Sequence, residues 1–315
     1  DIPSTTVNTI LNSLELDITK CNHKEVVVSI PSFRFDLERP IDLVEEVARI
    51  FGYENIPETY PHLPMIKKQN DPLLTYIKKI QTISMSLLLN EIITFSLENR
   101  HFYETFFPEI LERVVSIINP SNKELNVIRP SLLQGMLSVV KNNLNTENKN
   151  LKLFEIGRRY KKIENDVPFE ESVCSVCLSG EMFNNWYDHS RLVTFFDLKG
   201  MVDQIIRCFN INTVEIKPIQ VPFYSEGFQL LYNGNILGCL GKVHKQITDY
   251  FDIKEALYYS ELSIHNMLKS RCVDNTFKKF SKFPSSYRDI SIIVSENVKT
   301  QDIMDEIYSQ DKKII

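Results

Sequence analysis

The feature that most constrains the fold is a series of strand-like segments that follow one another between residues 151 and 263. They read LKLFEIGRRYKK, SVCSVCLSGEM, FQLLYNGNILGCLGKVHK and ALYYSELSI. Asn233–Gly234 stands between two apolar runs, and this dipeptide is typical of the tight turn of a β-hairpin. A helix is expected over EILERVVSI, residues 109–117, and VTFFDLKGMVDQIIRCFN is expected to run from a strand into a helix, with Asp197 and Lys199 orienting that junction. Consecutive strands with helices inserted among them favour an antiparallel sheet in an α+β domain.

A smaller α+β module precedes this region. Residues 4–16 have the apolar spacing of a short helix, and EVVVSI is a β-branched strand. PSFRFD is expected to continue extended into a second helix. Pro40 suits the first turn of that helix, and Gly52 suits the residue just past its end. Its predicted apolar face consists of Val44, Val47, Ala48 and Phe51.

Four carboxylates gather around the start of the second helix: Asp36, Asp42, Glu45 and Glu46. Acids near a helix N-terminus complement the helix dipole, and the residues alone favour this interpretation. The main alternative is a site for Mg²⁺, which takes oxygen ligands. An acid/base pair has the least support, because no nucleophile or histidine stands nearby in the sequence.

Composition excludes several classes of protein. A chain of 315 residues is expected to form two or three domains. Its net charge of −5 argues against a wholly basic nucleic-acid wrapper. With 9 glycines and neither GxxxxGK[ST] nor GxGxxG, a phosphate-cradling loop is not expected. We expect no membrane span, because no run of 18 apolar residues occurs, and the sequence shows no recognisable signal peptide.

The six cysteines are scattered, which suggests reduced thiols in a cytoplasmic protein. Cys174 and Cys177 form a lone CxxC inside a strand-like stretch, and no second pair follows at zinc spacing. We expect both to be buried structural cysteines, and a metal or redox role is the alternative.

A third region begins near Phe277 with KKFSKFPSSYRDISIIV, a predicted strand, and continues with a helix from about Thr300. One strand and one helix cannot enclose a core. Either this tail packs on the rest of the chain or it belongs to a truncated domain.

Several blocks carry a resemblance to a known family. PSFRFDLERPIDLVEEVARIFGYENIP closely resembles the signature of the bacterial phenylalanyl-tRNA synthetase β subunit. Further blocks resemble that subunit in the same order: INPSNKELNVIRPSLLQGMLSVVKNNLN, LKLFEIGRRY, FFDLKGMVDQII, LGCLGKVHKQITDYFDIK and KFPSSYRDISIIV. An ordered set of blocks is a more specific signal than any single motif.

The resemblance implies an α+β multidomain chain in three pieces. Residues 1–64 resemble the small module that carries the acidic helix. Residues 72–272 resemble a class II aminoacyl-tRNA synthetase-like antiparallel core without catalytic motifs. Residues 277–315 resemble the start of a ferredoxin-fold anticodon-binding domain, here truncated. Upstream domains of such a subunit are expected to be missing from this sequence.

The resemblance also implies binding sites. In the family the acidic motif holds Mg²⁺ at the boundary with the α subunit, and the matching positions here are Asp36, Asp42, Glu45 and Glu46. The RNA-facing domain of the family includes the tail, so Lys282, Tyr287 and Arg288 mark an expected tRNA-binding region.

Catalytic residues are not expected in this chain. Class II enzymes clamp the ATP phosphates with an arginine in an F-R-x-E motif and another in G-x-G-x-E-R. Leu153–Phe154–Glu155 stands in the place of the first motif, and the second does not occur in the sequence. We expect Arg158 and Arg159 to be surface or interface residues, and Arg129 to tie its loop to a neighbouring acid.

The resemblance implies a non-catalytic, tRNA-binding β subunit of phenylalanine–tRNA ligase in the cytoplasm, inactive by itself. Its expected partners are an α subunit that binds ATP, in a tetramer of two α and two β chains, and tRNA(Phe), with no DNA and no membrane. The helix near 73–90 and the strand near 91–97 are where class II proteins pair. The alternatives are a stand-alone metal-dependent hydrolase that uses the acidic cluster, and a nucleic-acid-binding regulatory module.

Overall fold

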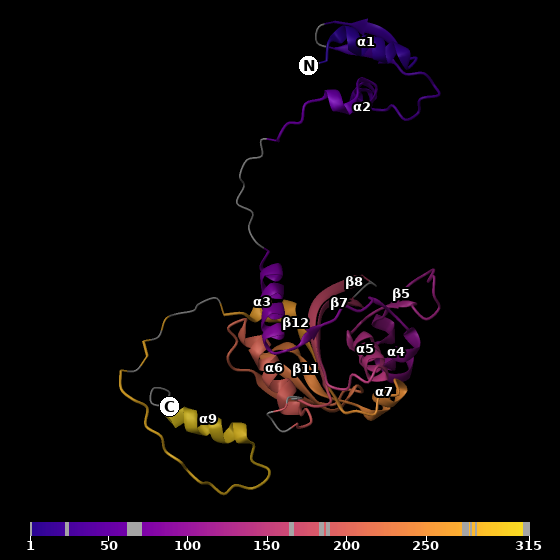
Figure 1. Ribbon diagram of the computed structural model, residues 1–315. Coiled ribbons are helices and arrows are strands. Elements are labelled where there is room, and N and C mark those ends of the chain that lie inside the picture. The colour runs from indigo at the N-terminus through magenta and orange to yellow at the C-terminus, as the bar shows by residue number, and fades with distance from the viewer. Residues whose placement is uncertain are drawn as a thin grey trace. The chain divides into compact units, whose positions relative to one another are not determined.

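A computed structural model describes residues 2–22, 25–61, 71–163, 167–182, 186, 190–272, 277, 279–280 and 282–310 (Figure 1). The chain divides into two compact units, Asp1–Gln69 and Asn70–Ile315. Within the part of the chain that is described, no helix is long and apolar enough to cross a membrane.

The first unit is a small α+β module. Its elements are α1 (Ser4–Ser13), the antiparallel strands β1 (Asp17–Cys21) and β2 (Val26–Ser29), α2 (Pro40–Phe51) and the 3₁₀ turn η1 (Tyr53–Asn55). The helices and the hairpin enclose a core of Ile10, Leu11, Leu16 and Val47. The predicted order of helix, strand and acidic helix is therefore confirmed.

The bounds of α2 follow from its sequence, whereas its buried face differs from the prediction. Gly52 has φ 92°, a conformation that favours glycine and ends the helix. Val44 is exposed, and Leu43 packs against the core in its place. The expectation that PSFRFD is extended is also wrong, because turn hydrogen bonds fold it back, including one of 3.0 Å from the Arg34 N–H to the Pro31 carbonyl.

The second unit is built on a sheet, as the strand-like segments predict. Among the described residues seven strands have the order β3-β7-β8-β12-β11-β10-β9, antiparallel except for the β3/β7 pair. Their bounds are β3 Asn90–Glu91, β7 Leu151–Lys162, β8 Pro168–Ser179, β9 Glu215–Ile219, β10 Tyr224–Tyr232, β11 Asn235–Val243 and β12 Leu257–Ser263. The predicted hairpin turn is confirmed, with φ 49° at Asn233 and 78° at Gly234.

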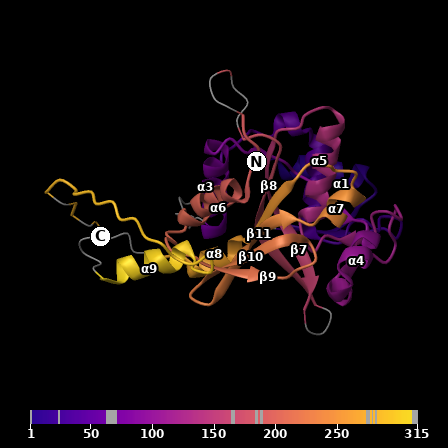
Figure 2. The ribbon, with the colours of Figure 1, turned by 90° about the horizontal axis from the view of Figure 1, so that it is seen from below.

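Helices cover both faces of this sheet (Figures 1 and 2). One core contains side chains of α3 and α6, and the other contains side chains of α4, α5 and α7. Neighbouring strand residues alternate between the two cores: Val176 faces the first and Cys177 the second. The helices are α3 Pro72–Ser86, α4 Arg100–Phe106, α5 Leu133–Asn145, α6 Phe195–Arg207, α7 Lys245–Tyr250 and α8 Ile264–Ser270.

Three predicted elements are different in the structure. The strand expected over 91–97 is divided into β3 and β4 (Leu97–Glu98), and β4 belongs to a small sheet with β6 (Val127–Ile128) and β5 (Val115–Ser116). The helix expected over 109–117 is a 3₁₀ segment, η2 (Pro108–Arg113), followed by β5. The strand expected before α6 is replaced by a helix cap.

That cap explains where α6 begins. The Asp197 carboxylate accepts a 2.8 Å hydrogen bond from the Thr194 backbone N–H and pairs with Arg191 at 2.6 Å. A carboxylate at this position satisfies a backbone donor that the helix leaves unpaired. This confirms the expectation that Asp197 orients the junction before the helix.

The tail contains a helix, α9 (Thr300–Gln310), with no buried residue. In the described tail, residues 284–295 form no strand, so the predicted strand there is wrong for this chain. A strand requires a neighbour that satisfies its N–H and C=O groups, and no described segment pairs with these residues. The ferredoxin-fold domain therefore stays a prediction.

Candidate functional site

The acidic motif contains a helix cap. Asp42 accepts hydrogen bonds of 2.7 Å from the Arg39 N–H and 3.0 Å from the Glu38 N–H. These backbone bonds, with the Arg39 bond first, hold the pKa of Asp42 below its usual value. This carboxylate therefore has a local structural role at the start of α2.

A guanidinium lies between two of the other acids. Arg34 contacts Asp36 at 2.7 Å and Glu46 at 3.3 Å, and Glu46 also pairs with Arg49 at 2.9 Å. Arg34 lowers the pKa of Asp36, and Arg49 together with Arg34 lowers that of Glu46. Arg34 thus supplies the positive charge that keeps these carboxylates ionised side by side.

The four predicted metal ligands do not form one ligand set in this chain. Glu45 is exposed, and among the described residues no group of three or more His, Cys, Asp or Glu is placed to hold a metal ion. Hard oxygen donors suit Mg²⁺, but in the arrangement seen here Asp36 and Glu46 already share an arginine. The magnesium site stays a prediction, and the hydrolase alternative gains no support.

The core unit contains a buried ion pair at the edge of its sheet. Arg129 Nη1 lies 2.9 Å from Glu155 Oε1, and both side chains are almost completely buried. Thr94 donates to the same carboxylate at 2.8 Å. This confirms the prediction that Arg129 ties its loop to an acid.

A second network crosses the middle of the sheet. Arg159 on β7 pairs with Glu171 on β8 at 2.8 Å and with Glu261 on β12 at 2.6 Å. Glu261 also accepts from the Ser131 hydroxyl at 2.8 Å and the Leu132 N–H at 2.9 Å. Arg159, which we expected at the surface or at an interface, is partly exposed and lies within this network, whereas Arg158 is exposed and pairs with Glu170.

These ion pairs determine whether the arginines of the core unit can bind the phosphates of ATP. Leu153 and Phe154, in the place of a phosphate-binding arginine, are buried on opposite sides of the sheet. Arg129 and Arg159 are each bound to carboxylates. An arginine that clamps ATP must be free to meet a phosphate, so neither of these two provides that function.

Cys174 and Cys177 are both fully buried on β8. Burial raises the pKa of each thiol to about 12. Because a thiolate is the reactive and metal-binding form, these cysteines are inert, in agreement with the structural role that we predicted.

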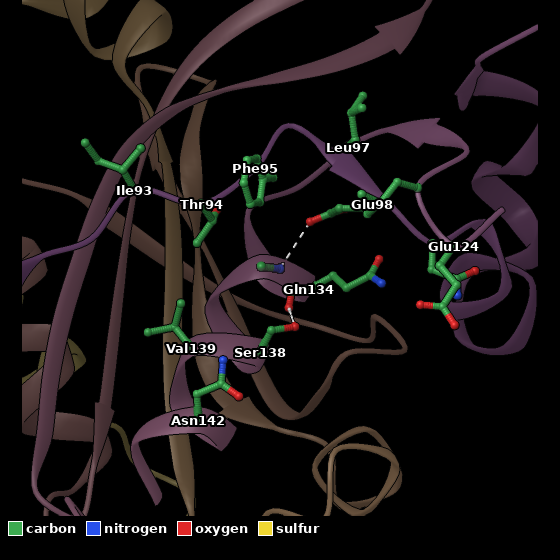
Figure 3. Close-up of a pocket in the computed structure, with 13 residues that line it drawn as sticks. Ile93, Thr94, Phe95, Leu97, Glu98, Glu124, Gln134, Ser138, Val139 and Asn142 are labelled. Atoms are coloured by element: carbon green, nitrogen blue, oxygen red, sulfur yellow. Dashed lines mark hydrogen bonds between the residues drawn. The ribbon is translucent and has the colours of Figure 1, made fainter. Parts of the chain in front are cut away.

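A cavity of about 450 Å³ lies between the segment 93–98 and helix α5 (Figure 3). At its floor the Glu98 carboxylate accepts a 3.1 Å bond from the Gly135 N–H and another bond from the Tyr103 hydroxyl. Glu98 is only 4% exposed, and burial raises its pKa to about 8. Sequence reasoning missed this group, because nothing in the stretch SLEN marks the glutamate as buried.

Two family models match most of the chain. The model for the phenylalanyl tRNA synthetase beta chain CLM domain covers residues 56–264. The chain belongs to the phenylalanyl-tRNA synthetase β chain family. The model for the tRNA synthetase B5 domain covers residues 1–53 of this β-chain homologue, which is the unit with the acidic helix.

Curated relatives agree with this family. The phenylalanine–tRNA ligase beta subunits of Francisella tularensis and Syntrophotalea carbinolica are 32% and 31% identical over 98% and 97% of this chain. The chain spans 39% of the length of each of these two relatives. Pyrrolysyl-tRNA synthetase from Desulfitobacterium hafniense shares the fold, with a TM-score of 0.51, 13% identity and coverage of 62% of this chain and 68% of its own.

The family models end before the tail. Lys282, Tyr287 and Arg288, the residues of the expected tRNA-binding region, are all exposed. The Arg288 guanidinium donates to the Ser286 hydroxyl at 2.8 Å and to the Tyr287 carbonyl at 2.7 Å. The stretch KKFSKF precedes Tyr287 and Arg288, and its Lys278 lies outside the described residues. The tRNA-binding role of this β-chain tail stays a prediction.

Proposed function

We propose that the protein is the β subunit of phenylalanine–tRNA ligase and that this part of it is a non-catalytic scaffold. The observation that carries the proposal is the synthetase-type core whose Arg129 and Arg159 are neutralised by Glu155, Glu171 and Glu261. Arginines that are held by carboxylates in this way are not available to the phosphates of ATP. The relatives' names support the ligase assignment.

The chemistry then belongs to an α subunit that binds ATP and phenylalanine, in a tetramer of two α and two β chains that charges tRNA(Phe) in the cytoplasm. The proposed docking surface is the segment 90–98. Ile93 and Phe95 on it are 90% and 84% exposed, and adjacent exposed apolar side chains are typical of an interaction site.

The acidic helix provides the proposed magnesium site at the boundary with the α subunit. Asp36, Asp42, Glu45 and Glu46 would supply carboxylate oxygens, and the ion would add charge neutralisation at the interface. Because Arg34 holds Asp36 and Glu46 in this chain, we propose that assembly is needed to complete the site. Calorimetric titration with Mg²⁺ should give binding in the complex, and Asp42→Asn should weaken it more than Glu38→Gln.

The tail is proposed to be the first part of an anticodon-binding domain. Its exposed Lys282, Tyr287 and Arg288 combine positive charge with an aromatic face. Such side chains contact phosphates and stack on bases in single-stranded RNA.

The experiment that tests the proposal compares the full-length chain, the α subunit from the same genome and their mixture in aminoacylation of tRNA(Phe). We expect activity in the mixture and none from the full-length chain alone. Phe95→Ser should reduce assembly. Phe196→Ser is the matched control, because Phe196 is 77% exposed on α6, which covers the other face of the sheet. Equal effects of the two variants would contradict the proposed surface.

A further inference from the structure

The cavity beside α5 contains one buried hydrogen-bond acceptor that has no donor. Gln134 Oε1 is buried and has no hydrogen-bond partner. It lies with the Glu98 carboxyl among the lining groups of the cavity (Figure 3). A buried acceptor left unpaired destabilises a protein, so an occupant that brings a donor is favoured here.

The charged side chains that line the cavity are acidic. Glu98 and Glu124 contribute carboxyl groups, and within the described residues no lysine, arginine or histidine lines the cavity. The rim is apolar, since Ile93 and Phe95 are exposed beside it. A long side chain with an aliphatic stem and a cationic end matches both the rim and the floor.

We propose that this cavity accepts a lysine or arginine side chain of the partner α subunit, which donates to Gln134 Oε1 and pairs with Glu98. The inference rests on the proposed function, and it adds the chemistry of one contact at that docking surface. A buried charge pair at an interface contributes mainly to specificity and to the rate of dissociation.

The surroundings of Glu98 give the contact a signature. Tyr103 of α4, Arg129 before α5 and Glu261 of β12 face this carboxyl, together with the Gly135 N–H. Burial keeps its pKa near 8 in the unbound chain, so the carboxyl is largely protonated at pH 7. A cation that enters the cavity favours the ionised form, and docking therefore releases a proton.

The test measures the dissociation constant between the full-length chain and the α subunit. Removing one partner of a buried charge pair weakens binding by roughly tenfold or more, and we expect this for Glu98→Gln. Glu112→Gln is the control: it makes the same substitution at an exposed position on η2, and should leave the constant within about twofold. Gln134→Met, which removes the unpaired acceptor, should also weaken binding.

Proton release supplies a readout that needs no variant. Calorimetry of the wild-type association in two buffers of different ionisation enthalpy should show release of a proton at pH 7, and binding should tighten as the pH rises towards 8. If the dissociation constant is unchanged by Glu98→Gln and no proton is released, the inference is overturned. The proposed function, in which the α subunit is the partner, is not affected by that result. Weakening by Gln134→Met alone indicates a neutral donor and also overturns the inference. If the wild-type chains do not bind each other, the proposed function and this inference both fail.

Discussion

Replacing Glu98 by glutamine removes a carboxyl group whose burial disfavours its ionised form. The side chain is 4% exposed and its pKa is raised by burial from 4.5 to about 8. Glutamine keeps an oxygen to accept from the Gly135 N–H and an amide to meet the Tyr103 hydroxyl, the two partners that the carboxyl has now. We therefore expect Glu98→Gln to stabilise the chain.

The size of the effect depends on pH. Because the folded-state pKa of Glu98 lies above the unfolded value, the folded chain binds the extra proton between pH 4.5 and 8, and wild-type stability falls as the pH rises through that range. Each pKa unit corresponds to about 1.4 kcal/mol. Glutamine does not titrate, so the variant should gain roughly 3 kcal/mol over wild type at pH 7 and almost nothing at pH 4.5.

Urea denaturation of both proteins at pH 5, 6, 7 and 8, followed by circular dichroism, measures this difference. Other groups titrate equally in the two chains, so the slope of the difference with pH isolates Glu98. Glu112→Gln, which changes an exposed carboxylate, should show no slope. A gain that is the same at every pH, or that shrinks as the pH rises, refutes the assignment of a buried, protonated Glu98.

Further changes test other parts of the account by the same unfolding measurement. Arg129→Met leaves Glu155 buried without its partner and should cost roughly 3–5 kcal/mol, whereas Arg158→Met at an exposed pair should cost under about 1 kcal/mol. A Cβ at Gly238 would lie 2.3 Å from the Glu261 carbonyl oxygen, so Gly238→Ala should destabilise the sheet, while Gly200→Ala in open space on α6 should stabilise it by about 0.5–1 kcal/mol. Asp197→Ala removes the cap of α6 and should cost about 1 kcal/mol at pH 7. Because Arg191 lowers the Asp197 pKa from 3.8 to about 2, that cost should vanish as the pH falls through this range. An equal loss of unfolding free energy for Arg158→Met and Arg129→Met would contradict the assignment of the buried pair. A loss for Asp197→Ala that persists at pH 2 would contradict the assignment of the cap.

Features that depend on neighbouring residues were predictable from the sequence. The Asn233–Gly234 turn and the helix between Pro40 and Gly52 follow from backbone preferences. The Arg129–Glu155 pair was foreseen only as a tie to an unnamed acid. These local rules placed most strands and helices of the core.

Features set by register and packing were not predictable. Arg159 lies opposite Glu171 across the β7/β8 ladder, and β12 then brings Glu261 beside them. Periodicity does not give the order of strands in a sheet, so the sequence did not distinguish the partly buried Arg159, which pairs with two carboxylates, from the exposed Arg158. Burial of Glu98 likewise arises from the contact of β4 with α5.

The acidic motif shows a different limit of prediction from the sequence. The resemblance implies four ligands for one ion, a site that stays a prediction, and the structure shows Arg34 bridging two of the four, Asp36 and Glu46. Ligand identity is a property of the sequence, whereas the approach of the oxygens depends on what else lies between them. The predicted strand in the tail was wrong, because no described segment pairs with these residues.

We infer that the chain acts through assembly and not through catalysis of its own. The most direct measurement is the mass, by light scattering on a sizing column, of the full-length chain mixed with the α subunit. We expect a stable complex whose mass equals two copies of each chain. Separate elution of the two chains, at concentrations where each is folded, would contradict it.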